Sequence, residues 1–281
     1  MNIGIRLHDT LGKDMEESLA LAKGQGFSCA HIAMQRVTPG FRMMDAPTLL
    51  TQDLADETVA KLKKYDIQPA VLGCYLNLGT PDLEELERSY ACYRAHLRFG
   101  RMIGAKVVGT ETGDLNTTYT FDPSCRTEEA LQLFIQRVRP IARWAEEEGQ
   151  LFAIEPVIRH IVCSVERAER VLEAIDSPNL RIILDSVNLL DPANCDDADK
   201  IVDDAIRRLG DRIEVLHMKD FHKVLTGDEV PAGACGTGIM NYTSLLKFAK
   251  AHEGLPMTLE DTVPANAEAA RLHLEKLAAA L

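Results

Sequence analysis

The sequence contains no uninterrupted apolar run of the roughly 18 to 20 residues that a membrane-spanning helix needs. Its first residues, MNIGIR, lack the basic region and the long apolar stretch of a secretory signal. The seven cysteines include no close-spaced pair and their number is odd, so a disulfide framework is not expected. From these absences we expect a soluble cytoplasmic protein without a membrane partner.

Positive charge is in deficit. The chain has 31 Lys and Arg against 43 Asp and Glu, a formal net charge of −12. Such a chain repels phosphate backbones at long range, so nucleic acid is not an expected partner. The 46% of hydrophobic residues is typical of a globular protein with one large core. No linker, charge block or low-complexity stretch interrupts the chain, which predicts a single domain over residues 1–281.

Short apolar segments alternate with longer segments of helical period along the whole chain. Each short segment is bounded by Gly, Pro or polar residues, as expected for strands that are buried on both faces. The predicted strands span residues 2–6, 28–33, 69–73, 105–109, 151–155, 181–185, 213–218 and 257–260. Eight strand–helix units in one series predict an α/β protein with the architecture of a (β/α)8 TIM barrel.

Two of the predicted helices carry a clear apolar stripe at steps of three and four residues, over 83–97 and 131–145. The sequence also indicates where helices begin. Thr80-Pro81-Asp82 offers an N-cap, a proline at the first helical position and an acid near the positive end of the helix dipole. Thr127 and Ser164 repeat the arrangement of a capping hydroxyl followed by an acid.

The main alternative architecture is a doubly wound open sheet. Such sheets usually carry a glycine-rich phosphate loop after the first strand. The segment after the first predicted strand, LHDTLG, is not such a loop. The barrel is therefore the favoured architecture.

In a barrel the catalytic groups lie at the carboxyl ends of the strands. The last four predicted strands end in Glu155, Asp185, His217 and Glu260. Three carboxylates buried together would raise one another's pKa, whereas a divalent cation removes that cost. Three oxygens and one imidazole nitrogen favour one Mn²⁺ or Mg²⁺ per chain, with Co²⁺, Zn²⁺ or Fe²⁺ also compatible. The alternative for each acid is a helix cap or an ion pair.

Inward and outward side chains alternate along a barrel strand. His217 and Lys219 therefore share the inward face. Glu260 and Asp261 are expected to point in opposite directions, and Glu260 is in phase with the strand end. This is why Glu260, rather than its neighbour, completes the predicted ligand set.

Four segments together resemble the sugar phosphate isomerase/epimerase family of the xylose isomerase-like TIM barrel superfamily: AIEP at 153–156, LDSVN at 184–188, LHMKDF at 216–221 and LED at 259–261. The resemblance extends over essentially the whole chain. It implies that Glu155 and Glu260 are metal ligands and also the acid/base pair, and that Asp185 and His217 are ligands only. A metal that polarises a carbonyl acidifies the neighbouring C–H, which a carboxylate then deprotonates.

The resemblance implies a divalent-metal-dependent isomerase or epimerase of a small sugar, keto-sugar or cyclitol, acting through an enediolate. The same proton abstraction followed by elimination would make the protein a lyase or dehydratase of a keto-sugar or inosose. A homo-oligomer is compatible with the resemblance.

The sequence departs from the family pattern in two places. Asn188 stands where family members often carry a histidine, and an amide cannot act as an acid or base. This keeps a non-catalytic sugar-binding barrel open. The additional ligands of endonuclease IV-like repair enzymes are missing, which makes a nuclease the weakest alternative.

Five further residues are candidates for substrate binding: Glu111, Arg159, His160, Asn188 and Lys219. Glu111 follows the fourth predicted strand in a turn flanked by glycines, where a helix-capping role is equally compatible. Arg159 and His160 belong to the loop after Glu155, where a solvated histidine is the alternative. Lys219 either holds a substrate oxygen or forms a salt bridge with a neighbouring acid.

Overall fold

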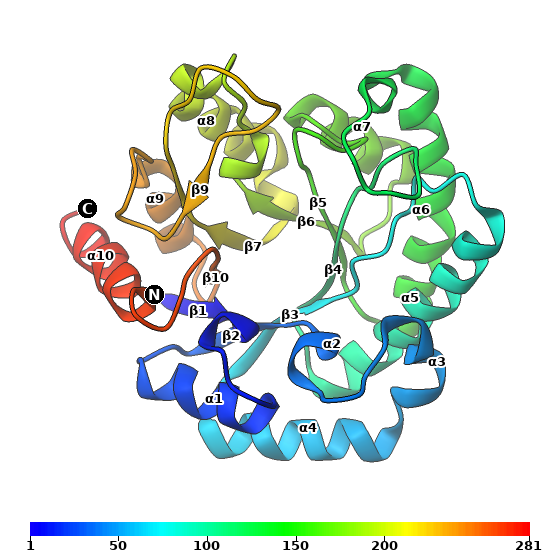
Figure 1. Cartoon of the computed structure of the whole chain (residues 1–281), viewed down its shortest axis with the longest axis horizontal. Helices are drawn as coiled ribbons and strands as arrows, with labels where there is room; N and C mark the ends of the chain where they lie inside the picture. Colours follow the sequence, from blue (N-terminus) through cyan, green and yellow to red (C-terminus); the bar gives the residue numbers. More distant parts are fainter.

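The computed structural model describes residues 1–281, with eight parallel strands in a closed ring (Figure 1). The order around the ring is β1-β10-β7-β6-β5-β4-β3-β2, so the first strand pairs with the last. The chain is therefore a (β/α)8 TIM barrel, and the open sheet is excluded. The bounds of the strands are β1 Asn2–Arg6, β2 Cys29–Ile32, β3 Gln68–Gly73, β4 Val107–Glu111, β5 Phe152–Glu155, β6 Leu180–Asp185, β7 Ile213–Met218 and β10 Pro256–Leu259.

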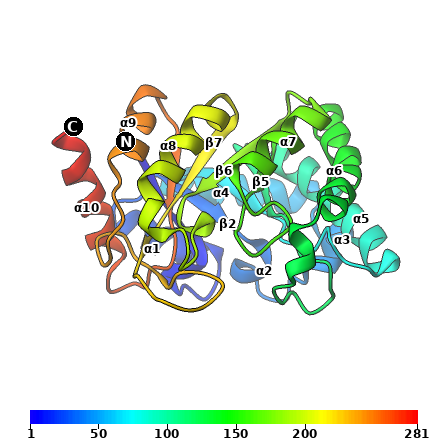
Figure 2. The same ribbon diagram turned by 90° about the horizontal axis from the view of Figure 1, so that it is seen from above.

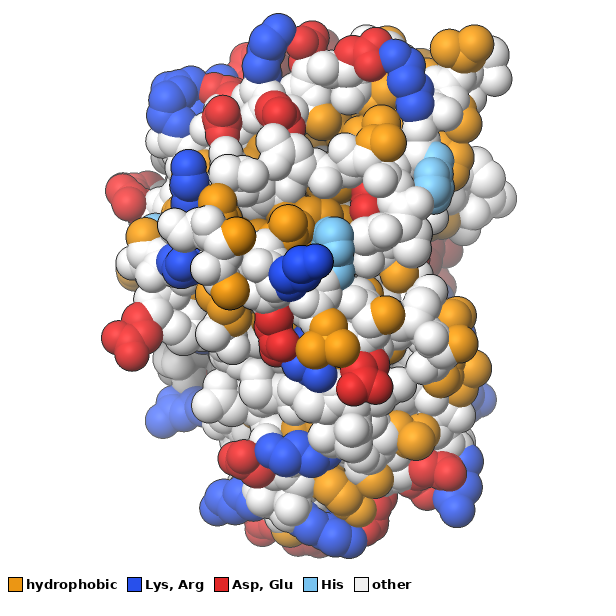
Figure 3. All heavy atoms as spheres, turned by 90° about the vertical axis from the view of Figure 1, so that its left-hand side faces the viewer, with side chains coloured by type: hydrophobic (Ala, Val, Ile, Leu, Met, Phe, Trp, Pro, Cys, Tyr) orange, Lys and Arg blue, Asp and Glu red, His pale blue; other side chains and the backbone are white.

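Helices form a layer outside the ring of strands (Figures 1 and 2). The longer helices are α1 Met15–Gly24, α4 Gln52–Tyr65, α5 Leu83–Ile103, α6 Glu128–Glu148, α7 Val165–Ile175, α8 Ala198–Leu209, α9 Thr243–Ala251 and α10 Ala267–Ala279. Two single-turn helices, α2 Met34–Val37 and α3 Ala46–Leu49, lie between β2 and α4. None of the helices combines the length and the hydropathy needed to cross a bilayer. On the side formed by α9 and α10, Lys and Arg side chains are interspersed with Asp and Glu (Figure 3).

The strands are buried on both faces because two separate apolar layers cover them. Most buried apolar side chains lie in one cluster between strands and helices. A smaller cluster from six strands fills the ring: Cys29, Ala70, Val71, Val107, Ala153, Ile183 and Val215. A Cβ on Gly4 would lie 2.2 Å from the carbonyl oxygen of Cys29. The chain therefore needs glycine where β1 approaches β2 so closely.

The predicted strands agree with the structure to within a residue or two, and β4 shows the largest shift. It spans Val107–Glu111 instead of 105–109, because the N–H of Ala105 bonds to the carbonyl of Gly100 and belongs to the end of α5. Glu111 consequently ends the strand rather than following it.

The predicted helix caps are confirmed at Thr127 and Ser164, whose side chains accept from the N–H groups of Ala130 and Arg167. The prediction for Thr80 was wrong. The cap of α5 is Asp82, whose carboxylate accepts from two backbone N–H groups, while the Thr80 hydroxyl donates to Glu85.

A short antiparallel hairpin beyond β7 was not predicted. It consists of β8 (Asp220–Phe221) and β9 (Ala232–Gly233), which are too short to show a hydrophobic period. The carboxylate of Asp220 accepts from the N–H groups of Gly236 and Met240, which fixes the turn after the hairpin. Residues 222–231 between the two strands contribute Glu229, Val230 and Pro231 to a cavity at the barrel mouth.

Candidate metal centre

Four buried side chains converge at the carboxyl ends of neighbouring strands. Glu155 ends β5, Asp185 ends β6, His217 precedes the last residue of β7, and Glu260 follows β10. One ligand atom from each of the four lies within 4.8 Å of all the others. Nδ1 of His217 lies 3.2 Å from Oε2 of Glu155 and 3.2 Å from Oε1 of Glu260. The structure thus brings together the four residues that the sequence selected.

This cluster fits a divalent cation. Both ring nitrogens of His217 and Oδ2 of Asp185 are buried without a hydrogen-bond partner, which is a costly state for polar atoms. Lys219 Nζ is 3.0 Å from that Asp185 oxygen, an ion pair whose angles do not make a hydrogen bond. Neighbouring ligands around a small divalent ion lie about 3 Å apart, close to the 3.2 Å that separates His217 from Glu155 and from Glu260. Three carboxylates and an imidazole are donors that such ions accept.

The pKa values of the four clustered side chains are shifted in different directions. Burial and the nearby charge of Glu260 raise the pKa of Glu155 to about 8. Burial also raises the pKa of Asp185 to about 6, although Lys219 opposes the shift. For Glu260, burial is outweighed by its contacts with His217 and Lys219, which hold the pKa of Glu260 well below its usual range. Burial lowers the pKa of His217, and the neutral imidazole is the form that binds metals.

Lys219 faces the same space as His217, as alternation predicts. Its ammonium lies 3.5 Å from Oε2 of Glu260 and 3.6 Å from Oδ2 of Asp261. The prediction that Asp261 points in the opposite direction from Glu260 was wrong. β10 ends at Leu259, and Asp261 has a left-handed φ of 54°, which turns its carboxylate back into the mouth. Strict alternation therefore holds only within the strand.

The side chain of Asn188 is hydrogen-bonded to Glu155 of the cluster. Its Nδ2 donates to Oε1 of Glu155 over 2.7 Å, while the N–H groups of Val187 and Asn188 both donate to Oδ1 of Asp185 over 3.0 Å. Hydrogen bonds from outside a ligand set fix its orientation. A single turn after β6 thus holds two of the four side chains.

Glu111 and His160 form a second group beside the cluster. Glu111 is in register with Glu155 on the neighbouring strand, and burial together with the charge of Glu155 raises its pKa to about 8. His160 is buried rather than solvated, with Nδ1 3.8 Å from Glu111 and Nε2 3.8 Å from Asp114. Burial and Arg159 lower the pKa of His160 to about 4, so the ring is neutral near pH 7.

The side chain of Arg159 forms its ion pair outside this group. Its Nε forms an ion pair of 2.8 Å with Glu229, which belongs to the loop between β8 and β9. The pair connects the loop after β5 to the hairpin, and 56% of the Glu229 side chain is exposed.

Three residues near the cluster were not selected from the sequence. The ring of His31 in β2 stacks on His217 with centroids 5.2 Å apart, and its Nδ1 lies 3.5 Å from Glu260. Its Nε2 pairs with the hydroxyl of Tyr75 over 3.1 Å. Arg6 ends β1 and lies 3.5 Å from Oε2 of Glu260. Applied to the first strand as well as the last four, the strand-end rule would have identified Arg6.

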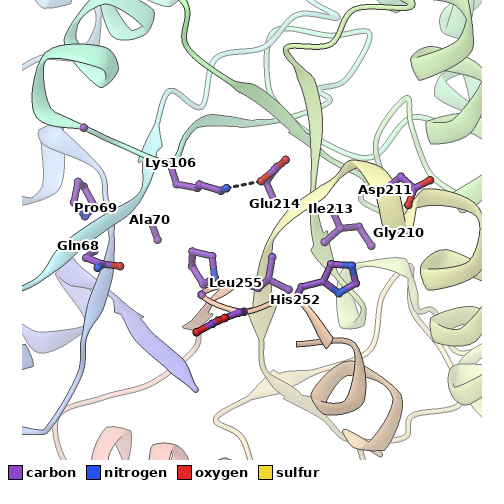
Figure 4. Close-up of a pocket in the computed structure, with 14 residues that line it drawn as sticks. Gln68, Pro69, Ala70, Lys106, Gly210, Asp211, Ile213, Glu214, His252 and Leu255 are labelled. Carbon is purple, nitrogen blue, oxygen red and sulfur yellow. Dashed lines mark ion pairs between the residues drawn. The ribbon is translucent and has the colours of Figure 1, made fainter. Parts of the chain in front are cut away.

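A cavity of about 650 Å³ opens beside the cluster, with Arg6, Asn188, Lys219 and Asp261 among its lining residues. A slightly larger cavity of about 750 Å³ lies at the opposite end of the barrel, where Lys106 and Glu214 form an ion pair of 2.7 Å (Figure 4). That second cavity is lined by the amino-terminal starts of strands. The smaller cavity is lined by Asn188 and Lys219, whose side chains contact Glu155 and Asp185 of the cluster. Barrel chemistry occurs at the carboxyl ends, so the smaller cavity is the relevant one.

The family model described as xylose isomerase-like TIM barrel matches residues 19–279. The chain belongs to this family. The resemblance seen in the sequence is therefore confirmed, and the family covers almost all of the described barrel. No curated protein sequence matches the chain.

Several solved structures superpose on nearly the full length of the chain. The 3-keto-D-glucoside 4-epimerase YcjR from E. coli has a TM-score of 0.74 at 16% identity, over 98% of this chain and 99% of that chain. The probable 3-DHS dehydratase AsbF from Bacillus anthracis has a TM-score of 0.73 at 14% identity, over 99% and 98%. The IOLI protein with a bound zinc atom has a TM-score of 0.72 at 17% identity, over 99% and 96%. At these identities the likeness establishes a common fold.

Proposed function

We propose that the chain forms one catalytic domain, a divalent-metal-dependent isomerase or epimerase of a keto-sugar or cyclitol. The observation that carries the proposal is the convergence of Glu155, Asp185, His217 and Glu260 within 4.8 Å at the barrel mouth. Neither ring nitrogen of His217 makes a hydrogen bond, although Nδ1 lies 3.2 Å from Glu155 and from Glu260, and a bound cation would satisfy these buried atoms. The fold shared with a keto-glucoside epimerase supports the reaction class.

The four side chains would hold one ion, with Mn²⁺ favoured by the three carboxylates. A zinc atom is bound in the structurally similar IOLI protein, so zinc belongs among the ions to test. When bound, the ion would polarise a substrate carbonyl and lower the pKa of the neighbouring C–H. Metal analysis of the purified protein is expected to give one divalent ion per chain.

Glu155 and Glu260 have the positions of a proton-transfer pair. They approach His217 from β5 and from the end of β10, which lie on either side of β6 and β7 in the ring. One carboxylate removes the proton from the carbon next to the carbonyl, and the other returns a proton on the opposite face. Asn188 orients Glu155, while Arg6 and Lys219 contact Glu260.

A lyase is the second candidate, because the shared fold includes a probable dehydratase. The first step is the same removal of a proton by a carboxylate. The reaction differs only in the second step, in which a hydroxide leaves from the next carbon instead of a proton returning. Product analysis separates the two: a dehydratase releases water and forms a double bond, whereas an epimerase conserves mass.

The deciding experiment incubates the purified protein with Mn²⁺ and a panel of keto-sugars and inososes in D₂O. Deuterium is expected at a carbon next to the carbonyl, detected by NMR and mass spectrometry. Glu155→Gln and Glu260→Gln are expected to stop this exchange, and metal content measured in each variant shows whether the ion was kept. No exchange across the panel by a metal-loaded wild-type protein would favour the non-catalytic sugar-binding barrel.

A further inference from the structure

Two cations at the barrel mouth share the same pair of carboxylates. The guanidinium of Arg6 lies 3.5 Å from Oε2 of Glu260 and 3.2 Å from Oδ1 of Asp261. The ammonium of Lys219 lies 3.5 Å from the same oxygen of Glu260 and 3.6 Å from Oδ2 of Asp261. It also lies 3.0 Å from Oδ2 of Asp185. Glu260 and Asp261 are therefore the two acids that hold both cations.

A bound metal ion would change this balance of charge. Asp185 and Glu260 belong to the proposed ligand set, so each would share its negative charge with the ion. The ion would also repel the two cations, because like charges interact strongly at short range in a buried site. Asp261 is the shared carboxylate that lies outside the ligand set. It is the acid that can hold both cations while the ion occupies the ligands.

The backbone around Asp261 is fixed so that its carboxylate faces the two cations. Its φ of 54° is left-handed, a conformation that side chains other than Asn and Asp rarely adopt. The residues on either side of it are hydrogen-bonded. The N–H of Glu260 donates to the carbonyl of Met218 over 3.1 Å, and the N–H of Thr262 donates to Oδ2 of Asp9 over 3.4 Å. The turn is therefore anchored to β7 and to the segment after β1.

The two cations differ in how far they depend on Asp261. Arg6 has a further partner outside the ligand set, because its Nε lies 3.0 Å from Oδ1 of Asp9. Of the three carboxylates that pair with Lys219, two are proposed ligands and the third is Asp261. Lys219 is therefore the cation that depends more on Asp261.

On the basis of the proposed function, we infer that Asp261 is a positioning residue of the metal centre. Its carboxylate holds Arg6 and Lys219 and so keeps these cations from competing with the ion for its ligands. Two adjacent residues thus have complementary tasks. Glu260 supplies an oxygen to the ion, and Asp261 balances the positive charges that the ion repels.

The test measures Mn²⁺ binding by calorimetry, which requires neither substrate nor turnover. Asp261→Asn removes the charge and keeps both the size of the side chain and its tolerance of a left-handed turn. We expect this variant to bind Mn²⁺ at least about tenfold more weakly, as is typical when a group that supports a ligand set is lost. Mn²⁺ binding with the wild-type Kd would overturn the inference.

Asp176 provides the matched control. It is an exposed aspartate at the end of α7, and its φ of 49° is also left-handed. Asp176→Asn makes the same chemical change in the same backbone conformation and is expected to keep the wild-type Kd. An equal loss of affinity in both variants would show that the change of Asp to Asn acts without the two cations, and would overturn the inference.

Two further backgrounds show whether Asp261 acts through the cations. In a Lys219→Met background, adding Asp261→Asn is expected to change the Kd for Mn²⁺ by no more than about threefold, because coupled residues are not additive. Arg6→Gln is the second background, where the added loss is also expected to be smaller than in the wild type. This background decides the question if Lys219→Met does not fold. An undiminished loss in the folded backgrounds would overturn the positioning role.

These measurements also separate the inference from the proposed function. Weaker Mn²⁺ binding by Asp261→Asn, in a protein that exchanges no C–H proton of any sugar, would support the inference and reject the isomerase or epimerase. Exchange by the wild type, with an unchanged Kd in Asp261→Asn, would support the proposed function and reject the inference. A wild type that binds no Mn²⁺ would reject both.

Discussion

The side-chain amide of Asn188 donates a 2.7 Å hydrogen bond to Oε1 of Glu155, and this leaves Oε2 of the same carboxylate 3.2 Å from His217. Such supporting contacts typically contribute about 10–100-fold to metal affinity or activity. We expect Asn188→Ala to lower kcat about tenfold. Asn188→Asp, which places a second carboxylate against Glu155, should lower kcat further. Steady-state rates of C–H exchange, measured together with the metal content, test this prediction. Equal rates in the wild type and both variants would show that Asn188 does not position Glu155.

The metal prediction is tested on His217, whose two buried ring nitrogens make no hydrogen bond. His217→Ala is expected to weaken Mn²⁺ binding by at least about 100-fold, measured by calorimetry. The wild-type protein should be stabilised by about 2.7 kcal/mol at a free ion concentration of 100 Kd, and the variant should lose this shift in thermal unfolding. Glu229→Gln, on the exposed rim of the cavity, is the matched control. The cluster is not a metal centre if the wild type is stabilised by none of the five ions Mn²⁺, Mg²⁺, Co²⁺, Zn²⁺ and Fe²⁺.

Metal binding is expected to release protons. Without an ion, the pKa of Glu155 is raised to about 8 and that of Asp185 to about 6, so near pH 7 Glu155 is protonated and Asp185 is mostly ionised. A metal requires the ionised carboxylate and displaces the proton. About one proton should therefore be released for each ion bound at pH 7. The affinity for the metal should rise with pH between about 6 and 8. Calorimetric titrations in two buffers with different heats of ionisation count the protons; a count of zero would contradict the raised pKa of Glu155.

Glu111 is adjacent to the cluster without belonging to it. We expect Glu111→Gln to raise KM about fivefold, the effect of losing roughly 1 kcal/mol of hydrogen bonding, and to leave the Kd for Mn²⁺ within about twofold. Arg159→Gln is the comparison, because exposed ion pairs such as that with Glu229 contribute little. A parallel loss of metal affinity in Glu111→Gln would place Glu111 among the ligands instead.

Two glycines provide a test of the barrel's packing. An added Cβ on Gly4 would meet the backbone oxygen of Cys29 at 2.2 Å, whereas one on Gly24 would meet no atom within 4 Å. We expect Gly4→Ala to reduce the free energy of unfolding by about 1–3 kcal/mol or more. Gly24→Ala in α1 should instead increase it by about 0.4–1 kcal/mol. Chemical denaturation measures the free energy of unfolding of both variants. Similar free energies of unfolding for Gly4→Ala and Gly24→Ala would contradict the close approach of β1 to β2.

The architecture and the four-residue cluster could be predicted from the sequence because both follow from local rules. Strands buried on two faces appear as short apolar runs, and their carboxyl ends must meet at one rim. Glu155, Asp185 and His217 are strand residues whose direction follows from alternation. Glu260 lies only one residue beyond its strand and keeps the same phase.

The remaining features depend on contacts between distant segments or on loop conformation. The left-handed turn at Asp261 reverses the direction that alternation predicts. His31 acquires its position through the ring of His217 and the hydroxyl of Tyr75, neither of which is near it in the sequence. The pair of Arg159 with Glu229 exists only because an unpredicted hairpin brings its loop to the mouth. No periodicity or spacing in the chain encodes these approaches.

Three of the four clustered side chains come from the strands β5, β6 and β7, and the fourth directly follows β10, which closes the ring against β1. No fragment that ends before β10 contains the complete set. If the cluster binds an ion as proposed, uptake during refolding would require the closed barrel, and release on denaturation should coincide with global rather than local unfolding.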